Sequence, residues 1–152
     1  MMKNIREFDY CIYCFSKKEN IDSPCPTCGY EAEYLGLPGW WLPPGTVLKG
    51  NYMVGKPLEE KEDEFHYLGW DIERKLLLEI VEYFPKQWVT RDVTATEQVN
   101  CFPGKESLLE EGRQQFFEKA KLYFQCVSRV EDVLHMDFFF RNQTCYYIRQ
   151  KK

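Results

Sequence analysis

The chain has 152 residues, of which 44% are hydrophobic and 29% charged, and its formal net charge is −4. This balance is typical of one or two small globular domains, and it excludes a disordered chain and a large two-lobed enzyme. A negative net charge disfavours nucleic acid and anionic membranes as partners. The sequence has no apolar run of about 18 residues and no apolar signal core at its N-terminus, so we expect a cytoplasmic protein without a membrane span.

Four of the seven cysteines form two Cys-x-x-Cys pairs, separated by ten residues. The pairs are Cys11 with Cys14 and Cys25 with Cys28. Thiolates at this spacing bind a tetrahedral zinc ion, and four of them leave no position open for a substrate. Gly29 follows the second pair and permits the left-handed backbone that turns amide hydrogens towards sulfur. We therefore predict a structural Zn²⁺ site in a zinc ribbon over residues 1–34, rather than disulfides.

Residues 35–45 contain three prolines and three glycines, which predicts a linker between two units. Trp40 and Trp41 lie within it, and they indicate that the linker packs against another part of the chain. The second predicted unit covers residues 46–152.

The second unit is predicted to be α+β, with a five-stranded antiparallel sheet and one long helix. Three strands bounded by turn residues come first, at 52–58, 65–70 and 75–84. Apolar residues recurring at helical spacing then predict a helix over 106–126. A hairpin with strands at 130–134 and 144–149, around a loop at 137–143, completes the expected order.

Several motifs of the second unit resemble a known family. The motifs are Leu42-Pro-Pro-Gly-Thr-Val-Leu-Lys-Gly50, Tyr67-Leu-Gly-Trp-Asp71, Glu82-Tyr-Phe-Pro85, Val89-Thr-Arg-Asp92 and Tyr146-Tyr-Ile148. They are similar to the N-terminal lobe of bacterial serine/threonine protein kinases in which a short zinc ribbon precedes the kinase domain. The resemblance implies a kinase N-lobe, with its helix after the third strand.

The groups that the resemblance would assign to kinase chemistry are replaced. The glycine-rich loop that closes over ATP phosphates corresponds to residues 59–64, which carry five carboxylates in six positions. The third-strand lysine corresponds to Val81, and the helix glutamate that pairs with it corresponds to Lys119. A shift of one position would offer Glu118, but no partner lysine. We therefore expect no ATP binding, as in a degenerate, pseudokinase-like lobe.

No catalytic residue is predicted. The 152 residues contain no His-Arg-Asp or Asp-Phe-Gly motif, and the only histidines, His66 and His135, lie in apolar strand contexts. The other cysteines, Cys101, Cys126 and Cys145, are scattered.

We expect a non-catalytic interaction module, an adaptor or regulator whose protein partner is a kinase, a C-lobe-like chain or a second copy. Candidate contact residues are Trp40, Trp41 and the run Phe138-Phe-Phe140. One alternative is a subunit of a split serine/threonine kinase, completed by a separate C-lobe chain, in which Lys119 would neutralise phosphate. Another is a ligand- or nucleic-acid-binding zinc ribbon protein.

Overall fold

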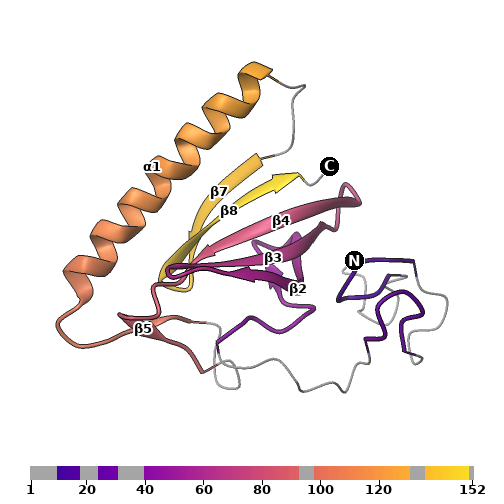
Figure 1. Ribbon diagram of the computed structural model, residues 1–152, viewed down its shortest axis with the longest axis horizontal. Coiled ribbons are helices and arrows are strands. Elements are labelled where there is room, and N and C mark those ends of the chain that lie inside the picture. The colour runs from indigo at the N-terminus through magenta and orange to yellow at the C-terminus, as the bar shows by residue number, and fades with distance from the viewer. Residues whose placement is uncertain (1–9, 18–23, 31–39, 93–97, 131–135, 151–152) are drawn as a thin grey trace.

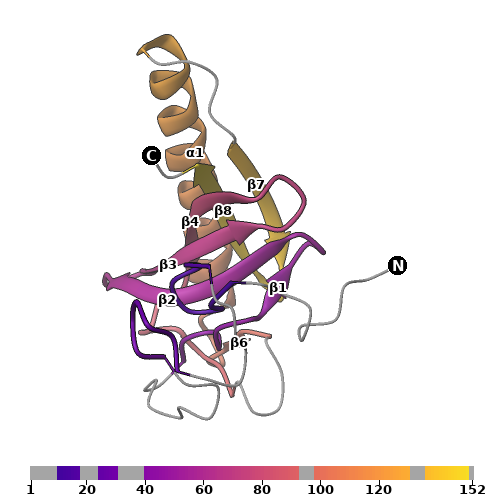
Figure 2. The same ribbon diagram turned by 90° about the vertical axis from the view of Figure 1, so that its right-hand side faces the viewer.

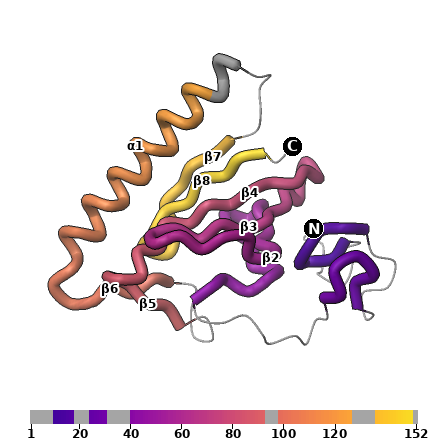
Figure 3. The backbone as a smooth tube through the Cα atoms, viewed as in Figure 1, coloured from indigo at the N-terminus to yellow at the C-terminus, as the bar shows by residue number. Residues whose placement is uncertain are grey.

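The computed structural model describes residues 10–17, 24–30, 40–92, 98–130 and 136–150. An antiparallel sheet forms one layer, and the single helix of these residues, α1 (Glu106–Val130), runs along one side of it (Figure 1). The segments that carry the first four cysteines lie at the other end of the strands from the start of α1 (Figures 1 and 3). The predicted α+β class is confirmed.

The main sheet has the strand order β1-β2-β3-β4-β8-β7, with every neighbouring pair antiparallel. Its strands are β1 (Val47–Leu48), β2 (Tyr52–Glu60), β3 (Glu64–Asp71), β4 (Leu76–Tyr83), β7 (Met136–Arg141) and β8 (Thr144–Gln150). The strands β2, β3, β4 and β8 correspond to expected strands, whereas β7 lies outside the expected range. The two-residue β1 extends the edge beside β2, as Figure 2 shows. A separate two-stranded sheet pairs β5 (Val89–Thr90) with β6 (Asn100–Cys101).

The first strand of the C-terminal hairpin was predicted wrongly. Val130 is the last residue of α1, and the strand β7 lies within the range predicted as a loop; residues 131–134 of the predicted strand lie outside the described residues. The turn is formed by Asn142 and Gln143, whose φ angles of 57° and 64° are those required by tight two-residue hairpins.

The strand β7 was not recognised in the sequence because its Phe138-Phe-Phe140 run shows no alternation of apolar and polar residues. Phe138 packs against Phe116 of α1, while Phe139 stacks on Tyr52 with ring centroids 5.9 Å apart. Aromatic side chains on both faces of a strand erase the period-two pattern that identifies it.

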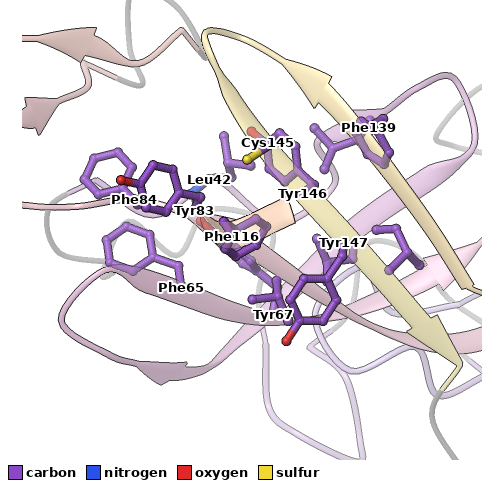
Figure 4. Close-up of a cluster of buried hydrophobic side chains, with 14 of the residues drawn as sticks. Leu42, Phe65, Tyr67, Tyr83, Phe84, Phe116, Phe139, Cys145, Tyr146 and Tyr147 are labelled. Carbon is purple, nitrogen blue, oxygen red and sulfur yellow. Dashed lines mark hydrogen bonds between the residues drawn. The ribbon is translucent and has the colours of Figure 1, made fainter. Parts of the chain in front are cut away.

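The main core includes part of the expected linker. Leu42 is fully buried, and the Trp41 ring stacks on Phe65 with centroids 4.3 Å apart. Figure 4 shows Leu42 among the aromatic side chains of the sheet. Residues 40–42 therefore pack against the sheet. Among the residues that the structure describes, no helix combines the length and hydropathy of a membrane span.

Candidate functional site

The four predicted metal ligands converge at one point. The Sγ atoms of Cys11, Cys14, Cys25 and Cys28 all lie within 4.8 Å of one another. The Cys11–Cys28 and Cys14–Cys25 sulfur distances are both 3.7 Å. Four sulfurs placed about 2.3 Å from a tetrahedral centre are about 3.8 Å apart, whereas a disulfide bond is about 2.05 Å long. The cluster therefore fits one metal ion with four thiolate ligands.

Each cysteine pair lies on a tight backbone turn. The amide of Phe15 donates to the carbonyl of Cys11, and that of Gly29 donates to the carbonyl of Cys25, both at 2.8 Å. Phe15 and Gly29 have φ angles of 62° and 78°. The left-handed conformation expected at Gly29 is thus present in both turns. The Tyr13 amide approaches the Cys11 sulfur to 3.4 Å, the kind of contact that supports a thiolate.

The thiols differ in acidity. Burial raises the pKa of Cys25, but hydrogen bonds from the Cys28 and Thr27 amides outweigh this effect and lower the pKa to about 6. Burial raises the pKa of Cys28 to about 12. A metal ion that binds here therefore displaces a proton from Cys28. Four soft thiolate donors in a tetrahedron suit zinc. With all four bound, the ion would have no open position for a substrate, as in structural sites.

The first cysteine turn is attached to the sheet through Phe15. Its ring stacks on Trp70 with centroids 5.7 Å apart, within a buried cluster of Phe15, Met53, Leu68 and Trp70. Leu68 and Trp70 alternate with His66 along β3, so the three side chains share one face of the strand. The cysteine turn therefore covers part of that face.

Gly55 allows the turn to approach this closely. A Cβ at Gly55 would lie 2.5 Å from the Phe15 ring and 2.8 Å from the Tyr13 carbonyl oxygen. The next residue, Lys56, donates its amide to the same carbonyl at 2.8 Å. Only glycine at this point of β2 leaves room for the ring.

Charged side chains form a chain on the same face, towards α1. Lys119 Nζ of α1 lies 2.6 Å from Glu64 Oε2, and the other Glu64 oxygen lies 2.9 Å from His66 Nε2. His66 Nδ1 lies 3.7 Å from Glu79, which pairs with Arg149. Basic and acidic side chains therefore alternate along this network, which runs from α1 across β3 and β4 to β8. Each of the two carboxylates lies between two basic groups.

The network shifts the acidity of its members. Burial raises the pKa of both Glu64 and Glu79, but His66 with Lys119, and His66 with Arg149, outweigh burial and lower each pKa to about 2. Burial lowers the pKa of His66, yet hydrogen bonds to the two carboxylates raise it above its ordinary 6.5. The arrangement therefore favours an imidazolium held between two carboxylates.

Sequence reasoning missed this network. Residues 59–64 were expected to form a charged turn, but the turn is confined to residues 61–63 and Glu64 is a buried residue of β3. The available signal was Glu64 and His66 at strand spacing, with Glu79 as one of the two charged residues of a largely apolar strand.

The positions implied by the kinase resemblance lie on the same face. Val81 of β4 is fully buried and is the cross-strand partner of His66. Lys119 is the helix residue that pairs with Glu64, while Glu118 is exposed and contacts Gln114. In this chain the helix therefore supplies the cation of the helix–sheet ion pair and the sheet supplies the carboxylate, the reverse of the arrangement in the family.

The other candidate residues from the sequence differ in their exposure. His135 lies outside the described residues. Trp40 and Trp41 are partly buried against the core, and Phe139 is buried, whereas Phe140 is 62% exposed. Of the proposed contact residues, Phe140 is therefore the one most available to a partner.

Comparisons with known proteins bear on the fold. No protein-family profile matches the sequence, and no curated protein matches it at a significant level. The chain is similar to a solved structure described as "PpkA-294 apo form", with a TM-score of 0.61 and 20% sequence identity. The match covers 73% of this chain and 38% of the other, so the chain spans well under half of that neighbour's length. The likeness concerns the fold alone, which is that of a kinase-like N-lobe.

Proposed function

We propose that the protein is a non-catalytic interaction module: a pseudokinase-like N-lobe stabilised by a structural zinc site, which acts as an adaptor or regulator through a protein partner. Its metal is Zn²⁺, held by Cys11, Cys14, Cys25 and Cys28, since four thiolates in this geometry suit that ion.

One observation carries the proposal: around Val81, the helix-facing side of the sheet is occupied by the chain's own side chains. In the kinase family a third-strand lysine and a helix glutamate meet on this side, beneath the loop that covers the phosphates. Here Phe15 of the cysteine turn packs against the β2–β3 part, and the Glu64–His66–Glu79 chain occupies the part next to α1. A nucleotide would have to displace both.

Electrostatics act in the same direction. The carboxylates of Glu64 and Glu79 lie beside Val81, and the valine side chain cannot neutralise a phosphate. Lys119 is already held by Glu64 at 2.6 Å. The β2–β3 turn adds Glu62 and Asp63 above this face, and like charges disfavour a triphosphate.

An interaction role is supported by apolar side chains left on the surface. Leu122 on α1 and Phe140 on the edge strand β7 are 61% and 62% exposed. Leu122 and Phe140 are the most exposed large apolar residues of the described chain, and we take them as the candidate contact residues.

Site-specific photocrosslinking in the source cell tests the role. A benzophenone side chain at position 122 or 140 should give a discrete crosslinked protein species. The same group at exposed Glu59, near the end of β2, is the matched control and should not. If neither test position crosslinks to a protein, the interaction role is wrong.

A further inference from the structure

A cavity of about 430 Å³ lies between the first half of α1 and the turn that joins β2 to β3. This volume is within the usual range for small-molecule sites, about 300–1,000 Å³. Its walls include the acidic residues Glu62, Asp63 and Glu64 from the turn, and Gly112 and Lys119 from α1. The zinc cluster and the Phe15 contact are not part of this cavity.

Two of the three acidic residues keep an uncompensated charge. Glu64 is neutralised by His66 and Lys119. Glu62 accepts a hydrogen bond from the Gln87 side-chain amide at 2.5 Å, but an amide carries no charge. Within the described residues, the Asp63 carboxylate forms no ion pair. The cavity therefore has a net negative wall.

An unpartnered phenol at the cavity provides a second, independent indication of a ligand. Tyr83 is 3% exposed, lines the cavity, and its hydroxyl has no hydrogen-bond partner in the described part of the chain. A Cβ at Gly112, another lining residue, would lie 1.7 Å from this hydroxyl. The hydroxyl therefore lies at the helix wall of the cavity, in space that glycine leaves open. A buried hydroxyl without a partner is costly, and a donor group on a ligand would satisfy it.

The other walls are aromatic. Trp88 and Phe116 line the same cavity. Aromatic faces attract cations and also bury an alkyl stem, while carboxylates hold the charged end. A phosphate or carboxylate ligand would meet the negative wall instead.

We propose that this cavity binds an organic cation, an alkylguanidinium or alkylammonium group. The positive charge of the ligand faces Glu62 and Asp63, and one of its N–H groups donates a hydrogen bond to the Tyr83 hydroxyl. The group comes either from a free small molecule or from an arginine or lysine side chain.

The test uses the full chain and probes matched in shape. N-butylguanidinium and a capped Gly-Arg-Gly peptide are titrated to about 50 mM, and the Trp88 indole and Gly112 amide signals are followed by NMR. N-butylurea and the corresponding citrulline peptide are the neutral controls. The proposal predicts saturable shifts with the cations and weaker ones with the neutral probes. Tighter binding of the peptide assigns the cation to a protein, and tighter binding of butylguanidinium assigns it to a small molecule.

Variants of the cavity residues test which side chains bind the cation. Asp63→Asn and Tyr83→Phe should each weaken cation binding by about threefold or more. Glu59→Gln, near the end of β2 and outside the cavity, should leave cation binding unchanged. The spectrum of each variant shows whether it is folded. The proposal is overturned if the neutral probes bind as well as the cations, if the cations shift neither signal, or if Glu59→Gln weakens binding as much as Asp63→Asn.

Discussion

Glu82 and Arg91 form a fully buried ion pair, in which Nη1 of the arginine lies 2.6 Å from Oε2 of the glutamate. Tyr67 and Tyr146 donate their hydroxyls to the same carboxylate, at 2.8 and 2.7 Å. The Arg91 Nε also donates to the Trp40 carbonyl at 3.0 Å. Every charge in this core network therefore has a partner.

This pair joins two of the motifs that carry the kinase resemblance, since Glu82 begins Glu-Tyr-Phe-Pro and Arg91 lies in Val-Thr-Arg-Asp. In this chain the two motifs hold the lobe together through a buried contact. Their presence is thus evidence for the fold and is compatible with the proposed non-catalytic role.

Removing the cation of this pair should be strongly destabilising. Arg91→Met leaves the Glu82 carboxylate buried without its counter-charge, and we expect a loss of about 3–5 kcal/mol in the free energy of unfolding. Arg91→Lys keeps the charge but loses the planar donor array, so its loss should be intermediate. Urea denaturation followed by circular dichroism measures both. Arg141→Met, at an exposed position of β7, is the control and should change stability by about 0.5 kcal/mol or less. An Arg91→Met protein as stable as this control would contradict the prediction.

The Glu64–His66–Glu79 network predicts a stability maximum between about pH 4.5 and 6.5. The pKa of folded His66 lies above 6.5, so its contribution is complete below pH 6.5 and is lost as the pH rises through the folded value. The pKa values of Glu64 and Glu79 fall from 4.5 to about 2, so their contribution is complete above pH 4.5 and is lost towards pH 2.

Urea midpoints of the wild type and of His66→Gln, measured from about pH 2 to about pH 9, test the assignment. The variant should lose the alkaline decline that is specific to the wild type, and its acid decline should become smaller, because His66 also lowers the pKa of Glu64 and Glu79. Identical slopes above pH 6.5 for the two proteins would show that His66 is not the group responsible.

Gly112 should resist substitution despite its position inside a helix. Alanine normally stabilises a helix interior by about 1 kcal/mol relative to glycine. Here the added Cβ would lie 1.7 Å from the Tyr83 hydroxyl, and Tyr83 is confined against Phe116. We therefore expect Gly112→Ala to lower the free energy of unfolding by about 1–3 kcal/mol. Thermal and urea denaturation give the sign directly.

Two controls accompany this variant. Glu111→Ala changes the neighbouring, exposed position and should be close to neutral. Adding Tyr83→Phe to Gly112→Ala removes the closest clash and should restore part of the loss; the ring carbon Cζ, 2.7 Å from the new Cβ, prevents full recovery. If Gly112→Ala is as stable as Glu111→Ala, the close packing described here is wrong.

The cysteine cluster predicts about one zinc ion per chain. Cys25→Ser should abolish the bound zinc measured by elemental analysis, because three thiolates hold the ion far less tightly. The Trp70 indole signal should also move, since the cysteine turn packs on that ring through Phe15, while the main core stays folded. Cys126→Ser, at an exposed cysteine outside the cluster, should retain the metal. Reduced, freshly purified protein without zinc would refute the assignment.

The sequence allowed prediction of the parts whose signals are local. The two Cys-x-x-Cys pairs identified the sulfur cluster, apolar periodicity identified α1, and turn residues delimited the strands β2, β3 and β4. The strand β7 was missed because Phe138, Phe139 and Phe140 are apolar on both faces. Periodicity can indicate a strand only when one of its faces is polar.

The contacts that decide function depend on tertiary structure. Nothing in the sequence pairs Lys119 with Glu64, which are 55 residues apart, or brings Phe15 against Gly55. The resemblance set Val81 at the position of the family's lysine, but it did not indicate which side chains occupy the surrounding face. Only the fold brings them together.

The central claim is that the helix-facing side of the sheet around Val81 does not accept a nucleotide, and titration calorimetry with magnesium-ATP tests it most directly. Because Phe15 and the Glu64–His66–Glu79 chain occupy this side, the protein should show no saturable binding tighter than about 100 μM. A dissociation constant below that value, abolished by Lys119→Ala, would contradict the account. It would show that Lys119 leaves Glu64 to neutralise phosphate, as a split kinase would require.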